Sequence, residues 1–248
     1  PFAIKNTCVE MSPSGRSFTS AFADSLCELM QKDDKIVAAT AAMPDGTGID
    51  KAMELFPSRV WDTGICESHA MDMLAGMAKT GCKPFFAVYS TFLQRAFDQA
   101  FQEVALQGLP VRLCIDRAGV VGGDGAVHHG FCDIALLRVL PNAVIMAAID
   151  EPSLQAAMTF MAEYNDGLSA LRYPRDTVKK FEGTCPPFVL GKAHQLRKTK
   201  SPKLAILSYG TTAIDAIVAA DRVDPDAIDV YDARFAKPVD GELVEQLL

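Results

Sequence analysis

Residues 85–115, FFAVYSTFLQRAFDQAFQEVALQGLPVRLCI, contain two apolar runs separated by an amphipathic stretch. The runs 85–89 and 111–115 have the length and composition of buried strands. Between them, residues 91–107 have the apolar spacing of one long helix, with Ser90 or Thr91 as its N-cap. A strand, a helix and a second strand in this order are typical of a parallel sheet, because a parallel connection must cross back over the sheet.

The same alternation extends to both sides of this unit. Further apolar runs predict short strands, and the segments between them predict helices, the first with Thr19 or Ser20 as N-cap. Residues 44–48 (PDGTG) predict a loop. We therefore expect an α/β fold, a parallel sheet with helices on both faces, over residues 1–180. The predicted strands are 36–40, 60–61, 143–147 and 169–173, and the predicted helices are 19–31, 67–79 and 152–164.

A change of composition marks the end of this first domain. Residues 177–202 are polar and basic, which predicts a linker at 181–202. A new strand–helix–strand pattern then begins, so residues 203–248 are interpreted as the start of a second α/β domain. The chain begins at Pro1 without Met and ends at Leu248 inside a helical pattern. We therefore expect it to be a piece of a longer polypeptide.

Composition excludes several classes of function. The chain has 248 residues, 24 Lys and Arg against 31 Asp and Glu, and a formal net charge of −7. This acidic balance argues against nucleic acid or an anionic membrane as partner. With 49% hydrophobic residues the chain can form a core, yet it has no membrane-spanning run or secretion signal. Seven scattered cysteines argue against a disulfide framework and favour a reducing, cytoplasm-like compartment.

Two candidate site segments follow predicted strands. In the segment 62–70, Glu67 opens a helix, where the helix dipole favours a carboxylate; spacing alone favours a solvated first-turn residue. In the segment 89–95, Tyr89 ends a strand, and Phe92 and Arg95 lie one turn apart on the next helix. The pattern by itself favours Phe92 as a core residue.

Two further segments combine glycine, histidine and arginine. Residues 116–131 (DRAGVVGGDGAVHHGF) form a long Gly-rich loop of the kind that binds ligands, and residues 171–175 (LRYPR) end a strand with two arginines. Arg172 and Arg175 are by default surface charges, or they could converge with Arg95 and Arg117 on a phosphate. The GDG at 123–125 lacks the frame of known phosphate motifs. No spacing indicates a catalytic triad or a metal site in this chain.

Taken together, these stretches resemble the 1-deoxy-D-xylulose-5-phosphate synthase family, thiamine diphosphate enzymes of the transketolase superfamily. The specific matches are YSTFLQRAFDQ and DRAG-x-x-G-x-DG-x-x-H-x-G-x-x-DI, and the resemblance covers about residues 36–176. It implies a pyrimidine-binding domain followed by part of a C-terminal domain, 1–180 and 203–248. The domain that holds the cofactor's diphosphate and Mg²⁺ has no counterpart here.

The resemblance also implies roles for individual residues. Glu67 would hydrogen-bond the pyrimidine N1′ of thiamine diphosphate, and Phe92 would stack on that ring. His128 would be a second catalytic residue that also binds substrate. The remaining substrate-binding positions would be Tyr89, Arg95, Arg117, Asp124 and Arg175, with the two arginines 117 and 175 on the substrate phosphate.

The implied reaction condenses pyruvate and D-glyceraldehyde 3-phosphate, with loss of CO₂, to 1-deoxy-D-xylulose 5-phosphate. That product leads to isoprenoids and thiamine. The resemblance further implies a cytoplasmic (in a plant, plastid) homodimeric enzyme, and a fragment that is inactive alone. Transketolase, a 2-oxoacid dehydrogenase β subunit and a non-catalytic module of the same fold remain alternatives. Ser68, Val127 and Asp176 depart from the family pattern, and a slip of one residue would exchange His128 for His129.

Overall fold

The computed structural model describes residues 2–5, 8–11 and 15–248, and its main element is a seven-stranded sheet. The strand order is β12-β7-β8-β6-β5-β3-β4. All neighbours pair in parallel except β12, which runs antiparallel to β7 at one edge. The predicted α/β fold with a parallel sheet is thus confirmed. The strands are β3 Ile36–Thr40, β4 Val60–Asp62, β5 Lys83–Tyr89, β6 Arg112–Asp116, β7 Val144–Ala147, β8 Ser169–Arg172 and β12 Phe235–Lys237.

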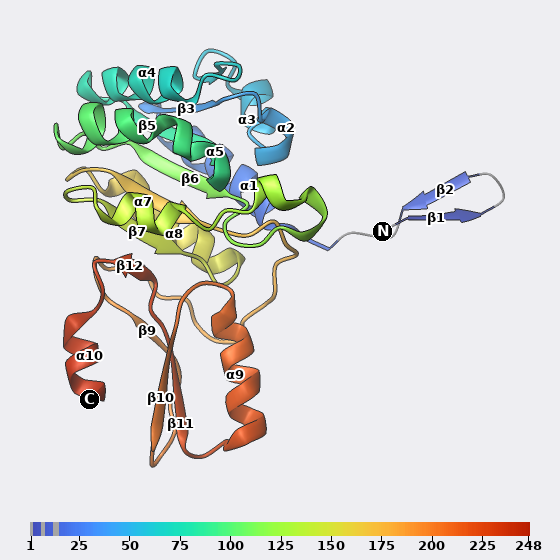
Figure 1. Ribbon diagram of the computed structural model, residues 1–248, viewed down its shortest axis with the longest axis vertical. Helices are drawn as coiled ribbons and strands as arrows, with labels where there is room; N and C mark the ends of the chain where they lie inside the picture. The colour runs from blue at the N-terminus through green and yellow to red at the C-terminus, as the bar shows by residue number, and fades with distance from the viewer. Residues whose placement is uncertain (1, 6–7, 12–14) are drawn as a thin grey trace.

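Helices cover both faces of this sheet (Figure 1). Neighbouring strand residues separate into two cores. Phe85 packs with α1 (Phe18–Lys32) and α8 (Glu151–Glu163), whereas Phe86 packs with α4 (Glu67–Lys79) and η2 (Ala100–Ala105). Both side chains are fully buried, which explains why the strands read as continuous apolar runs. The helices are α1 Phe18–Lys32, α2 Pro44–Thr47, α3 Asp50–Leu55, α4 Glu67–Lys79, α7 Asp133–Arg138 and α8 Glu151–Glu163.

Two predictions about helix starts and loops are wrong. The N-cap of α1 is Ser17, whose side chain accepts a hydrogen bond from the Ser20 backbone N–H. Thr19 is therefore free to turn its hydroxyl toward the sheet. Residues 44–48 are not an open loop, because Pro44 starts the single-turn helix α2, which ends at Gly48 in the left-handed region.

The single long helix predicted over residues 91–107 is also wrong. The chain instead forms four short pieces, of which the last is a π-helix: α5 Ser90–Leu93, η1 Gln94–Ala96, α6 Phe97–Gln99 and η2 Ala100–Ala105. Ala96 leaves the α-helical region, with φ −112° and ψ 14°. The Leu106 N–H then bonds to the Phe101 carbonyl five residues back, at 3.0 Å. No cap side chain bonds at Ser90 or Thr91, since Tyr89 is the N-cap position.

The C-terminal part forms a separate three-stranded sheet of order β10-β11-β9 (Figure 1). Its strand β9 lies inside residues 181–202, the stretch expected to be a linker, and β12 crosses over to complete the first sheet. The two parts are therefore joined by strand pairing as well as by the chain. The remaining elements are β1 Phe2–Lys5, β2 Cys8–Met11, β9 His194–Arg197, β10 Leu204–Ser208, β11 Ile228–Asp232, α9 Thr212–Val223 and α10 Gly241–Leu247.

Candidate active site

The carboxyl ends of β5 and β6 and the start of α4 bring the predicted site residues together. Tyr89 ends β5 and pairs in register with Asp116, the last residue of β6. After β6 the chain forms the Gly-rich loop 117–131, which contains the short helices η3 Gly122–Asp124 and η4 Ala126–His128. Ligand sites of parallel α/β proteins lie beyond the carboxyl ends of the strands.

Glu67 is the first residue of α4 and is almost fully buried, with 2% of its surface exposed. Its Oε1 accepts a hydrogen bond from Arg95 Nη1 at 2.5 Å. The guanidinium of Arg95 also lies over the Phe92 ring, 4.6 Å from its centroid. The burial of Glu67 excludes the solvated first-turn role that its spacing allowed, because a surface residue of that kind would be exposed.

Phe92 is half-buried and belongs to an aromatic cluster. Its ring stacks on Tyr89, with centroids 5.8 Å apart, and meets the His128 ring edge-on at 5.6 Å. It packs only partly against the core on its side of the sheet. Phe92 is thus not the purely core residue that its spacing favours, because its ring is half-buried and contacts Tyr89, His128 and the Arg95 guanidinium.

His128 and His129 have different surroundings. The His128 ring faces Phe92 and Tyr89, and its Nδ1 lies 2.9 Å from the Asp124 carbonyl oxygen. His129 turns to the loop instead, where its Nδ1 accepts from the Val121 N–H at 3.2 Å. The geometry thus favours His128 over His129 as the residue that a ligand on the aromatic cluster would meet.

Asp124 lies between the two arginines predicted to bind phosphate. Its Oδ1 is 2.5 Å from Arg175 Nη1, and its Oδ2 is 3.4 Å from Arg117 Nε. Arg117 is nearly buried and lies over the Tyr89 ring at 4.0 Å, and it also donates to the Gly46 carbonyl. Burial of Tyr89 raises the pKa of its hydroxyl, and the nearby Arg117 lowers it in part. All the predicted site residues therefore lie in one contiguous network.

Sequence reasoning did not select Asp116, Thr19 or Gly46, yet all three belong to this network. Asp116 is fully buried and accepts hydrogen bonds from the Thr19 hydroxyl at 2.8 Å and from the Arg117 N–H at 2.6 Å. Gly46 touches the Tyr89 hydroxyl so closely that a Cβ would overlap it. The available signals were the polar residue at a strand end and the glycine in PDGTG. Neither signal indicated which partner these residues would contact.

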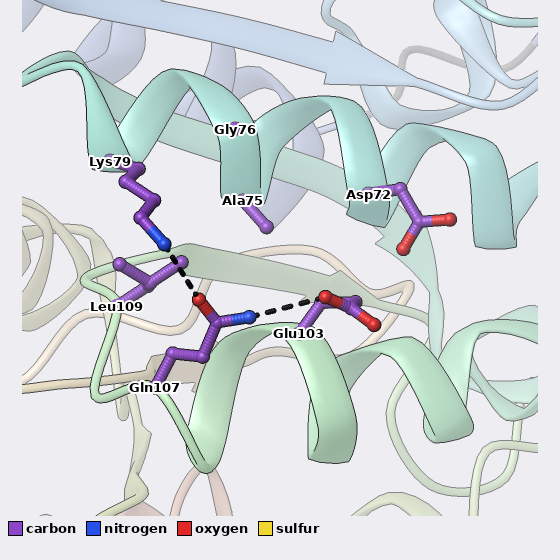
Figure 2. Close-up of a pocket in the computed structure, with 7 residues that line it drawn as sticks. All are labelled: Asp72, Ala75, Gly76, Lys79, Glu103, Gln107 and Leu109. Atoms are coloured by element: carbon purple, nitrogen blue, oxygen red, sulfur yellow. Dashed lines mark hydrogen bonds between the residues drawn. The ribbon is translucent and has the colours of Figure 1, made fainter.

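A groove of about 370 Å³ lies elsewhere, between α4 and η2. Figure 2 shows Lys79 donating to Gln107, and Gln107 to Glu103, across its floor. None of the predicted site residues lines it. It is an open, polar surface groove and does not form part of the cluster around Glu67.

Across residues 2–5, 8–11 and 15–248, no three or more His, Cys, Asp or Glu side chains are grouped so that they could hold a metal ion. Within the same described part of the chain, no helix is long and apolar enough to cross a bilayer.

Residues 14–180 match the family described as "Transketolase, pyrimidine binding domain". The chain belongs to this family. Over its whole length the chain is also 43% identical to a 1-deoxy-D-xylulose-5-phosphate synthase of Helicobacter hepaticus. It spans 39% of that curated relative's length.

Solved structures of transketolases share the fold. A protein described as a split gene transketolase, inactive β4 tetramer, superimposes with a TM-score of 0.82 at 28% identity, over 94% of this chain and 76% of that one. Transketolase from Campylobacter jejuni superimposes with a TM-score of 0.81 at 19% identity, over 96% of this chain and 39% of that one. The match extends beyond residue 180 and so includes most of the C-terminal part.

Proposed function

We propose that this chain is the pyrimidine-binding part of a thiamine-diphosphate-dependent synthase. The parent polypeptide would condense pyruvate with D-glyceraldehyde 3-phosphate to 1-deoxy-D-xylulose 5-phosphate and release CO₂. The observation that carries the proposal is the buried Glu67 carboxylate paired with Arg95, whose guanidinium lies over the Phe92 ring, with Arg117 and Arg175 in the same network. The 43% identity to a synthase of this kind supports it.

The residues present fit the pyrimidine of thiamine diphosphate. Arg95 donates to Oε1 of Glu67, which leaves Oε2 as an acceptor for a protonated ring nitrogen. The half-buried Phe92 ring would stack on the pyrimidine. When bound, thiamine diphosphate supplies the nucleophilic carbon that amino-acid side chains lack. The role of Glu67 is to hold a proton at the pyrimidine nitrogen, because a carboxylate at the positive end of a helix is a well-placed acceptor.

The other side chains would bind and orient the substrates. Arg117 and Arg175 would take the phosphate of the aldehyde, since guanidinium groups match phosphate geometry. His128 would donate a proton or a hydrogen bond to the substrate oxygen that gains charge. Tyr89, Arg95 and Asp124 would line the approach to that oxygen. The diphosphate and Mg²⁺ would be held by residues outside this chain, in a cytoplasmic homodimer whose product leads to isoprenoids and thiamine.

Calorimetry on the isolated chain tests the part played by these 248 residues. We expect no measurable binding of thiamine diphosphate with Mg²⁺ and no synthase activity, because the chain contributes only the pyrimidine side of the site. Micromolar binding by the chain alone would contradict this expectation.

Transketolase is the second candidate, favoured by the structural match that covers 76% of a split gene transketolase. A full-length polypeptide containing these residues, supplied with cofactor and D-glyceraldehyde 3-phosphate, separates the two. Release of CO₂ from pyruvate supports the synthase. Turnover only with a ketose phosphate as donor supports transketolase.

A further inference from the structure

Asp116 is a fully buried carboxylate at the end of β6, and its hydrogen bonds reach one side of the candidate site. Its Oδ1 accepts from the Arg117 backbone N–H at 2.6 Å. Its Oδ2 accepts from the Thr19 hydroxyl at 2.8 Å and lies 3.2 Å from Arg117 Nη1. The carboxylate therefore holds both the backbone and the side chain of Arg117.

The conformation of Arg117 needs such support. Its φ is +59°, in the left-handed region, where a residue other than glycine is strained. Its guanidinium is fixed on two further sides by the Tyr89 ring and the Gly46 carbonyl. These contacts direct the Arg117 Nε edge toward Asp124 and Arg175. Asp124 pairs with both arginines at that edge, so a phosphate that bound both of them would replace the Asp124 carboxylate between them.

Thr19 connects Asp116 to helix α1. It lies in the first turn of α1, whose N-cap is provided by Ser17, so its hydroxyl is not needed as a cap. The hydroxyl instead donates to Oδ2 of Asp116, the oxygen that Arg117 Nη1 also approaches, while the Arg117 backbone N–H donates to Oδ1. A buried carboxylate with a donor on each of its two oxygens has a fixed orientation relative to the arginine that it holds.

From these contacts we infer that Asp116, supported by Thr19, is a positioning residue that fixes Arg117 for the phosphate of the acceptor substrate. The inference rests on the proposed function, in which Arg117 binds that phosphate. Asp116 itself touches no substrate, because it is fully buried behind Arg117. It acts through the orientation of the guanidinium.

Asp116→Asn in the full-length protein tests the inference, because it keeps the shape and removes the charge. We expect the KM for D-glyceraldehyde 3-phosphate to rise roughly tenfold, with kcat changed less than about twofold. With D-glyceraldehyde, which has no phosphate, KM should stay within about twofold. In an Arg117→Ala background the same substitution should have no further effect on KM. An equal loss with both aldehydes, or no change with either, would overturn the inference.

Thr19→Val is the second variant, since it removes one hydrogen bond and leaves the buried carboxylate in place. We expect a rise of roughly threefold in KM for the phosphorylated aldehyde only. Thr159→Val is the matched control, because its hydroxyl donates to the Gln155 carbonyl within α8, away from the site. A rise in the control equal to that in Thr19→Val would also overturn the inference.

Titration with inorganic phosphate separates this inference from the proposed function, because it needs no turnover. If the wild-type protein has no synthase activity but binds phosphate more tightly than Asp116→Asn, the proposed function fails and the positioning role stands. If both proteins bind phosphate equally, or neither binds it, the positioning role is overturned.

Discussion

Arg95 Nη1 lies 2.5 Å from Glu67 Oε1, and the same guanidinium covers the Phe92 ring. The buried carboxylate at the start of α4 thus has a counter-ion that also contacts the aromatic cluster. Arg95 is half-exposed, so solvent reaches the arginine of this ion pair but not the Glu67 carboxylate. One cation thereby connects the carboxylate and the ring that we propose hold the pyrimidine.

Glu67→Gln or Glu67→Ala should abolish exchange of the C2 proton of bound thiamine diphosphate in a full-length protein. The physical reason is that neither an amide nor a methyl group can share a proton with the pyrimidine nitrogen. We expect a loss of roughly 100-fold or more, measured by NMR in D₂O. Asp72→Asn is the control, since Asp72 is an exposed acidic residue on the same helix. Unchanged exchange in the Glu67 variants would remove Glu67 from the mechanism.

Gly130→Ala should destabilise the protein and displace the Gly-rich loop. A Cβ at this position would overlap the Arg117 carbonyl and the Ser90 side chain, and the backbone of Gly130 pairs with that of Gly119. We expect a loss of about 2 kcal/mol in the free energy of unfolding, measured in urea. Gly123→Ala in the same loop is the control, because only the tip of Arg175 lies near its Cβ position. Equal stability of the two variants would contradict the packing argument.

Arg112→Lys should be strongly destabilising although the charge is kept. Arg112 is fully buried, and its guanidinium donates to the carbonyls of Met161, Pro110 and Tyr164 and to the side chain of Asn165. Burial lowers the pKa of Arg112 to about 10. An ammonium cannot reach all four acceptors, so we expect a loss of about 3 kcal/mol by denaturant unfolding. Arg222→Lys, on the exposed surface of α9, should change stability by less than about 0.5 kcal/mol.

The free energy of unfolding should fall as pH rises from about 4 to above 6. Burial raises the pKa of Asp116 to about 6, and burial raises that of Asp232 to the same value. Because each folded pKa lies above the ordinary value near 4, the folded state binds more protons in this window. Their stabilising contribution is complete below pH 4 and is lost as pH rises through 6.

Asp116→Asn isolates one of these two carboxyls. At about 1.4 kcal/mol for each pKa unit, a rise of about two units corresponds to about 3 kcal/mol between the ends of the window. We expect the variant to lose about that much of the pH dependence, measured by urea unfolding at pH 4.5 and 7.5. An Asp116→Asn profile parallel to that of the wild type would show that this carboxyl does not titrate in the window.

Much of the architecture was determined by the sequence alone. The apolar runs 85–89 and 111–115 predicted strands of a parallel sheet, because strands buried on both faces need apolar side chains at every position. The helices predicted over residues 67–79 and 152–164 correspond to α4 and, with a shift of one residue, to α8. Glu67, Phe92 and the arginines could be named as candidates because family motifs place them at strand and helix ends.

The tertiary structure decided what periodicity does not encode. The helix after Tyr89 breaks at Ala96 and continues as a π-helix, although its apolar spacing suits one helix. Thr19 reads as a helix cap in the sequence, yet its hydroxyl bonds to Asp116 97 residues away. Burial also distinguishes Glu67 from a solvated first-turn acid. The contacts of Thr19 and Glu67 join residues that are far apart in the sequence, and only the folded chain brings those residues together.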